Sequence, residues 1–160
     1  MKTMKMISSR GKEIDLSAKS VDSLNSALSG NLLRSGDERY DEFRAIWNGM
    51  IDKKPALIVR CKDSKDVINA VNFARDNDLL ISVRSGGHHV SGKSLCDGGM
   101  VIDLSLMRDV KVDPENRTAM VQGGAKLGDI DKETHKFGLV APLGVVSATG
   151  VAGLTLHGYQ

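Results

Sequence analysis

Aromatic residues, cysteines and long apolar runs are all scarce in this sequence of 160 residues. The two cysteines, Cys61 and Cys96, are too few for the disulfide framework of a small secreted protein, and they fit free thiols in a reducing compartment. No apolar run approaches the roughly 20 residues of a membrane span, and the basic N-terminus lacks the apolar segment of a signal peptide. These absences predict a cytoplasmic location and no membrane partner.

An excess of charge of one sign is also lacking. The 22 Lys and Arg residues nearly balance the 20 Asp and Glu residues, and both signs are mixed along the chain. Proteins that bind nucleic acid usually concentrate basic residues in one stripe, so we expect no nucleic-acid partner. The apolar content of 41% is enough for an ordinary core, and the length is that of about one domain.

Glycine is the residue present in excess, with 17 copies, and the chain becomes organised after Pro55. Three apolar runs are typical of buried strands: residues 56–61, 79–84 and 100–104. Between the first two runs, Ser64 offers an N-cap for a helix that ends near Asn77. This helix is predicted to carry four apolar residues on one face: Val67, Ile68, Val71 and Ala74. A strand, a helix and a strand in this order usually form a parallel βαβ unit.

Beyond the third run, turn-forming residues separate residues 110–112 from 118–122, which predicts a hairpin. A helix is predicted from Leu127 to about Phe137, with Gly138 as its C-cap. The fold class is therefore α+β, a βαβ unit followed by a mixed sheet with flanking helices. Within this length, two parts are predicted: an N-terminal helical segment at residues 1–50 and the main domain at residues 51–160.

Two glycine-rich loops are the first candidates for chemistry. Gly86 and Gly87 follow a predicted strand, where paired glycines let backbone N–H groups converge on a phosphate. The pair lacks the third glycine of the GxGxxG fingerprint, and Gly123-Gly124 lacks the ending of a Walker loop. A nicotinamide-binding Rossmann site and a P-loop are thereby disfavoured. From composition alone, a plain turn is the more common explanation of such a pair.

His88 and His89 leave three interpretations open at this stage. A loop histidine is usually solvated or hydrogen-bonded. A metal site would need Cys96 and His157 as further ligands, and adjacent histidines point to opposite sides of an extended segment, which disfavours it. In the third interpretation, a neutral imidazole attacks an electrophilic cofactor. We assign no residue as a metal ligand.

Four blocks of sequence resemble a known family. They occur in order at residues 84–92, 96–105, 121–125 and 144–156. Together they are similar to the FAD-binding domain of the FAD-linked oxidases, the berberine-bridge-enzyme-like (BBE-like) members of the vanillyl-alcohol oxidase and p-cresol methylhydroxylase superfamily. The resemblance covers about residues 55–156, and it implies the p-cresol methylhydroxylase type of fold, with FAD lying between two lobes.

The resemblance also implies the residues of the cofactor site. In the family, the first block wraps the FAD pyrophosphate and its histidine commonly bonds the 8α carbon of the flavin, so His88 is the candidate for covalent attachment. Val146 stands where some relatives carry a second attaching cysteine, so a single bond is expected. The implied cofactor-binding residues are Arg84, Ser85, Gly86, Gly87, His88, His89, Gly92, Gly144, Ser147, Gly150 and Gly153.

The resemblance ends at Leu156, where relatives continue into a substrate-binding domain and this chain reads His157-Gly158-Tyr159-Gln160. We therefore expect a fragment truncated at its C-terminus and assign no catalytic residue. The leading hypothesis is the FAD-binding portion of an oxidase of a small alcohol, sugar or amine, with dioxygen as acceptor. The alternatives are a non-catalytic flavin-binding remnant and a small metal-binding module that uses His88, Cys96 and His157.

Overall fold

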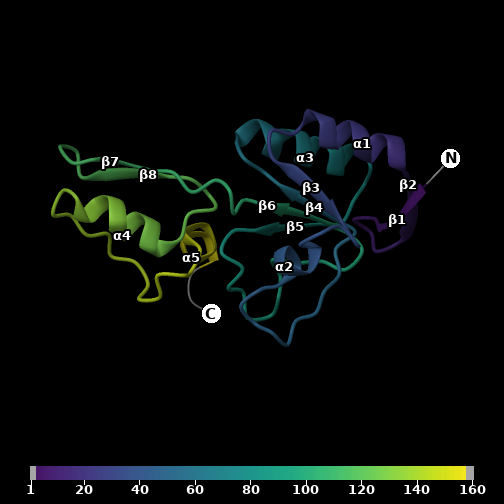
Figure 1. The fold of residues 1–160 in the computed structure, drawn as a ribbon. Helices are drawn as coiled ribbons and strands as arrows, with labels where there is room; N and C mark the ends of the chain where they lie inside the picture. The colour runs from purple at the N-terminus through teal and green to yellow at the C-terminus, as the bar shows by residue number, and fades with distance from the viewer. Residues whose placement is uncertain (1–2, 158–160) are drawn as a thin grey trace.

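The computed structural model describes residues 3–157, which form a sheet-based lobe and a smaller lobe beside it (Figure 1). The strands are β1 (Thr3–Ile7), β2 (Glu13–Ser17), β3 (Asn31–Arg34), β4 (Leu57–Arg60), β5 (Ile81–Arg84), β6 (Met100–Asp103), β7 (Val110–Asp113) and β8 (Thr118–Val121). The helices are α1 (Ala18–Ala27), α2 (Tyr40–Arg44), α3 (Ser64–Asp76), α4 (Leu127–His135) and α5 (Val151–His157).

The larger lobe is built on a four-stranded sheet with the order β3-β4-β6-β5. Strands β4 and β5 both run parallel to β6, and β3 runs antiparallel to β4. Helix α3 connects β4 to β5, so the predicted βαβ unit is confirmed, with β6 inserted between its two strands. The sheet is mixed and helices flank it, which confirms the predicted α+β class.

Apolar side chains cover both faces of this sheet, because its central strands alternate between two buried clusters. Leu57 and Val59 of β4 pack on one face against α1 and α3, while Ile58 packs on the other face near Tyr40 of α2. All four residues of β6 are buried. Parallel strands buried on both faces read as continuous apolar runs, which is why β4 and β6 were visible in the sequence.

Helix α3 begins one residue before its predicted start, and its cap and its buried face also differ from the prediction. The side chain of Asp63, rather than Ser64, accepts the capping hydrogen bond from the Asp66 N–H. The buried residues are Asp66, Ala70 and Ala74, whereas Ile68 is 59% exposed and Val71 is 43% exposed. The prediction of Ile68 and Val71 on the buried face was wrong. Small alanines fit the close approach of α3 to the sheet, so the largest apolar residues did not mark the packed face.

The predicted N-terminal helical segment at residues 1–50 is corrected in part, because its described residues form strands as well as helices α1 and α2. Strands β1 and β2 form an antiparallel hairpin, and β3 pairs with β4 as part of the main sheet. Leu32 and Leu33 of β3 are both buried. A strand of four residues buried on both faces shows neither helical nor alternating periodicity, so the sequence pattern concealed it.

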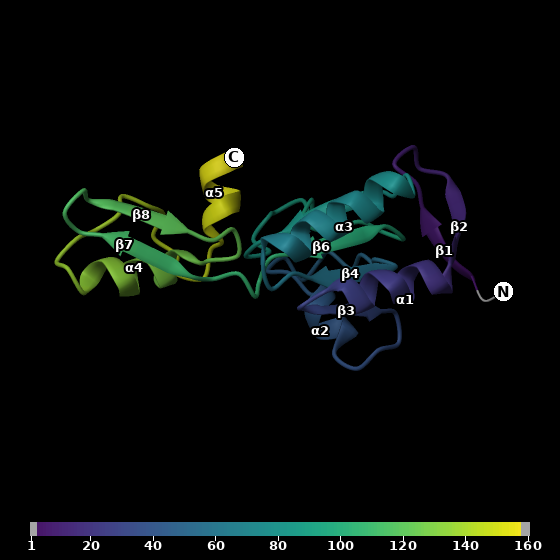
Figure 2. The ribbon, with the colours of Figure 1, turned by 90° about the horizontal axis from the view of Figure 1, so that it is seen from above.

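The smaller lobe contains the predicted hairpin and helix. Strands β7 and β8 pair antiparallel, α4 packs beside β7, and Gly138 follows the helix with a φ of +66°. Both views show α5 on the side of this lobe that faces the sheet (Figures 1 and 2). Within residues 3–157, no helix is long and apolar enough to cross a membrane.

Candidate cofactor site

The two glycine-rich segments singled out in the sequence lie in direct backbone contact. A Cβ built on Gly86 would lie 2.3 Å from the backbone nitrogen of Gly150, and a Cβ built on Gly150 would lie 2.3 Å from the nitrogen of Gly86. Only glycine at both positions permits this approach. The loop that leaves β5 and the segment that leads into α5 therefore form one site, at the junction of the two lobes.

The segment that leads into α5 is also joined to the start of α4 by backbone hydrogen bonds. The backbone N–H groups of Leu127 and Gly128 donate to the carbonyls of Thr149 and Ser147 at 2.9 and 3.0 Å, and Val151 N–H donates to Ala125 at 2.9 Å. The first two bonds satisfy N–H groups in the first turn of α4, which would otherwise lack partners. The segment is thus held between the helix on one side and the loop after β5 on the other.

The other predicted residues with small side chains lie either in the first loop or on the approach to α5 and within it. Gly87 and Gly92 have φ values of +69° and +67°, a backbone conformation that favours glycine, and they shape the first loop. A Cβ on Gly153 would meet nothing within 4 Å, so the chain's own packing does not require glycine there. Gly144 is partly buried and Ser147 is exposed, both on the approach to α5.

Two donors where the first loop leaves β5 have no hydrogen-bond partner among the described residues. The hydroxyl of Ser85 is buried without a hydrogen bond, and so is the Nε of Arg84. Another nitrogen of the Arg84 guanidinium donates to the carbonyl of Phe43, which holds the side chain against α2. Buried donors without partners are costly. Unpaired donors beside a backbone that only glycine can form fit a phosphate-bearing group such as FAD.

His88 and His89 make different contacts. His88 is partly buried, and burial, together with the positive charge of Lys126, lowers its pKa below the ordinary 6.5, although a hydrogen bond with the Ala148 backbone acts in the opposite direction. The ring of His89 instead accepts from the Ser91 N–H at 3.2 Å within the same loop. The lowered pKa favours the neutral form of the His88 ring at neutral pH.

Sequence reasoning missed a segment that contacts the first loop along its length, here called the strap, residues 46–53. Trp47 N–H donates to Gly87 at 3.0 Å, the Asn48 side chain donates to Val90 at 2.7 Å, and the Lys53 ammonium donates to Gly92 at 3.0 Å. The segment has no periodicity. The one signal in the sequence was Trp47, the only tryptophan in the chain.

A buried ion pair was also missed, at the carboxyl ends of the parallel strands. Asp103 of β6 is fully buried, and its carboxylate lies 3.5 Å from the guanidinium of Arg60 on β4. Arg60 in turn lies over the ring of Phe43, 3.7 Å from its centroid. Since Arg84 pairs with Asp103 in the register of β5 and β6, this cluster supports the strand from which the first loop leaves.

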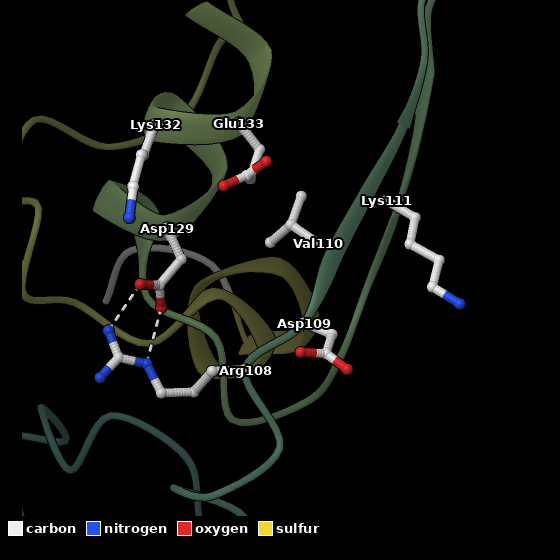
Figure 3. A pocket seen from close by; sticks show the side chains of 7 residues that line it. All are labelled: Arg108, Asp109, Val110, Lys111, Asp129, Lys132 and Glu133. Carbon is white, nitrogen blue, oxygen red and sulfur yellow. Dashed lines mark hydrogen bonds and ion pairs between the residues drawn. The ribbon is translucent and has the colours of Figure 1, made fainter. Parts of the chain in front are cut away.

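A separate hollow of about 420 Å³ lies between α4 and β7 (Figure 3). Its lining is mostly charged, and Arg108 donates two hydrogen bonds to Asp129 across it at 2.9 and 2.5 Å. The lining residues are Arg108, Asp109, Val110, Lys111, Asp129, Lys132 and Glu133. It includes none of the predicted cofactor-binding residues.

Metal-binding side chains are not gathered at the site. Among residues 3–157, no three or more His, Cys, Asp or Glu side chains are arranged to hold an ion. Cys96 is buried in the cluster beneath the sheet, whereas His157 is exposed at the end of α5. The set His88, Cys96 and His157 is therefore not assembled.

The fold and the paired glycine segments fit a domain that binds a dinucleotide cofactor. Residues 55–159 match the family described as FAD binding domain. An FAD-linked oxidoreductase of Dictyostelium discoideum is 44% identical over 133 residues, which is 82% of this chain and 29% of that protein. The chain belongs to this FAD-binding family.

Solved structures of similar proteins agree. The crystal structure of 6-hydroxy-D-nicotine oxidase from Arthrobacter nicotinovorans has a TM-score of 0.77 and 41% identity, covering 79% of this chain and 28% of that one. A variant of a BBE-like protein of Physcomitrella patens has a TM-score of 0.79 and 25% identity, covering 85% and 30%. The predicted p-cresol methylhydroxylase type of fold is confirmed. The chain spans about three tenths of the length of these relatives, and the part it spans is the FAD-binding portion of flavin-dependent oxidoreductases.

Proposed function

We propose that the loop after β5 and the segment before α5 together hold the FAD. Their backbone contact at Gly86 and Gly150 is the observation that carries this proposal. The proposed cofactor-binding residues are those predicted from the sequence: Arg84, Ser85, Gly86, Gly87, His88, His89, Gly92, Gly144, Ser147, Gly150 and Gly153.

Each part of the site has a role that its chemistry suits. Ser85 and Arg84 supply donors to the phosphates, because both carry buried polar atoms without partners. The glycines let the backbone lie against the cofactor. When bound, FAD supplies the chemistry of accepting a hydride from a substrate. No residue of this chain is proposed to move the substrate proton.

We propose further that His88 attaches the flavin covalently. The bond joins an imidazole nitrogen to the 8α carbon; the imidazole and that carbon each release a proton, and an electron pair passes to the flavin, from which dioxygen removes it. The lowered pKa of His88 supports this role, because only a neutral imidazole offers a lone pair.

The whole protein is proposed to oxidise a small alcohol, sugar or amine and to pass the electrons to dioxygen. The likeness to a nicotine oxidase supports an oxidase of this kind. Because the chain covers about three tenths of such proteins, a domain that holds FAD without turnover is the second candidate for the chain by itself. Two free, buried cysteines support the cytoplasm as its compartment.

The test is to purify the chain, load it with FAD and precipitate it with acid. Flavin that stays with the polypeptide supports the attachment, and its release by the substitution His88→Ala assigns the residue. FAD that fails to bind at all contradicts the holding role, whereas FAD that binds but is fully released by acid contradicts only the covalent bond.

A further inference from the structure

The strap at residues 46–53 brings an aromatic ring onto the proposed attachment residue. The rings of Trp47 and His88 are stacked, with their centroids 5.9 Å apart and an angle of 18° between their planes. The backbones of the two segments are joined at the same place, because Trp47 N–H donates to the Gly87 carbonyl at 3.0 Å. Trp47 is therefore fixed relative to His88 both through its backbone and through its ring.

Packing in the core does not account for the position of this indole. Trp47 is 66% exposed and belongs to neither buried cluster. A tryptophan side chain in a protein core would bury a large apolar surface, and this one does not. Its neighbour Ile46 does pack inward, against the buried cluster that includes Tyr40 and Ile58, and it lies near Gly87. The strap thus anchors itself through Ile46 and leaves Trp47 against the imidazole.

We propose that Trp47 is a positioning residue for His88, holding the imidazole in one orientation for its bond to the flavin. This inference rests on the proposed function, in which His88 is the attachment residue. The indole restrains one face of the ring. A neutral imidazole keeps a lone pair on one of its two ring nitrogens, which is the lone pair that a new bond requires.

The strap can position His88 because its residues donate hydrogen bonds to the loop both before and after His88. Asn48 and Lys53 bond the carbonyls of Val90 and Gly92, and a Cβ on Gly92 would lie 2.6 Å from the side chain of Ile51. A ring held by a preorganised neighbour loses less entropy when it reacts than a freely rotating one.

Fluorescence tests the stacking without any cofactor, because Trp47 is the only tryptophan in the chain. A protonated imidazole quenches a stacked indole, so emission from the flavin-free chain should fall as the pH drops through the His88 pKa. Lys126 is the charged group acting on this ring, and Lys126→Met should move the midpoint upwards. The transition should vanish in His88→Ala and persist in His89→Ala. Emission that does not titrate, or that titrates in His88→Ala, overturns the proposal.

The rate at which flavin becomes covalently attached tests whether Trp47 positions His88 for the reaction. With FAD added, Trp47→Ala and the milder Trp47→Phe should form acid-stable flavin more slowly, by about tenfold for alanine, while the affinity for non-covalent FAD changes far less. Met50→Ala is the matched control, because Met50 lies on the same strap and is 91% exposed. Trp47→Ala with the rate of the unaltered chain overturns this proposal alone. An unaltered chain that never forms acid-stable flavin overturns the proposed attachment, and the positioning role with it.

Discussion

Gly86 and Gly150 contact each other through their backbones, although they are far apart in the sequence. A side chain on either residue would overlap the other's main chain, because a Cβ at each position would lie 2.3 Å from the partner's nitrogen. Gly150 is also bridged to Lys126, the residue before α4. This pair of glycines therefore lies where the first loop, the start of α4 and the start of α5 meet.

Alanine at either glycine is predicted to weaken FAD binding. Gly86→Ala and Gly150→Ala should each force the two segments apart, at a cost of about 1–3 kcal/mol, which corresponds to roughly 5- to 150-fold in Kd. Flavin fluorescence titration of the purified variants measures this change. Gly49→Ala is the control, because a Cβ there meets nothing within 4 Å. Equal affinities in all three variants would contradict the paired site.

The adjacent glycines 123 and 124 offer a sharper comparison of stability. A Cβ on Gly124 would lie 1.7 Å from the carbonyl oxygen of Leu104, whereas a Cβ on Gly123 would meet only a Leu104 methyl group at 3.1 Å. Gly124→Ala should lower the melting temperature by on the order of 10 °C. Gly123→Ala should lower it much less, since a flexible side chain can move. The reverse order would show that this turn is packed differently.

Asp66 is predicted to be the most important single carboxylate for stability. Burial raises the pKa of Asp66, but hydrogen bonds from the N–H groups of Lys62, Ser29 and Gly30 outweigh burial and leave the pKa below its ordinary value. Asp66→Asn should cost about 2–3 kcal/mol, because an amide NH₂ group then faces backbone donors. Asp76→Asn at the exposed end of the same helix is the control, and urea unfolding measures both.

The same carboxylate gives stability a defined pH dependence. Because the folded-state pKa of Asp66 is lower than the unfolded value, its contribution is fully present above about pH 4 and is lost as the pH falls through the folded-state pKa. The unfolding free energy of the unaltered chain should therefore drop more steeply in acid than that of Asp66→Asn. Parallel curves for the two proteins would contradict this role.

Attachment of flavin is predicted to depend on the protonation of His88. Burial and Lys126 hold the His88 pKa below 6.5, so the neutral ring predominates at neutral pH and the attachment rate should stay level there. The rate should fall at lower pH, as the ring gains a proton and loses its lone pair. Acid-stable absorbance followed over time measures the rate, and a rate that rises on acidification would exclude the neutral imidazole as nucleophile.

The parts of the fold that the sequence predicted are those with strong local patterns. Strands β4 and β6 are continuous apolar runs, and the β7–β8 hairpin is marked by its turn residues. Strand β3 was not predicted, because a strand of four residues with apolar side chains on both faces shows no periodicity in the sequence. The buried face of α3 was misjudged because its two alanines pack more closely than the larger Ile68 and Val71, which lie outward.

The candidate site was predicted in part for the same reason. Gly86 and Gly150 can be recognised in the sequence because only glycine fits where two main chains touch. The strap cannot be recognised in this way, since Asn48 and Lys53 donate to backbone carbonyls, which every residue has. The stacking of Trp47 on His88 arises only from the tertiary fold.

The most direct measurement of the central claim is an amide NMR titration of the ¹⁵N-labelled chain with FAD. If the two glycine segments hold the cofactor, the largest shifts will cluster at residues 84–92 and 144–153, with the Trp47 indole shifting as well. Shifts confined to the charged hollow around Arg108 and Asp129, with the glycine amides unmoved, would contradict the account.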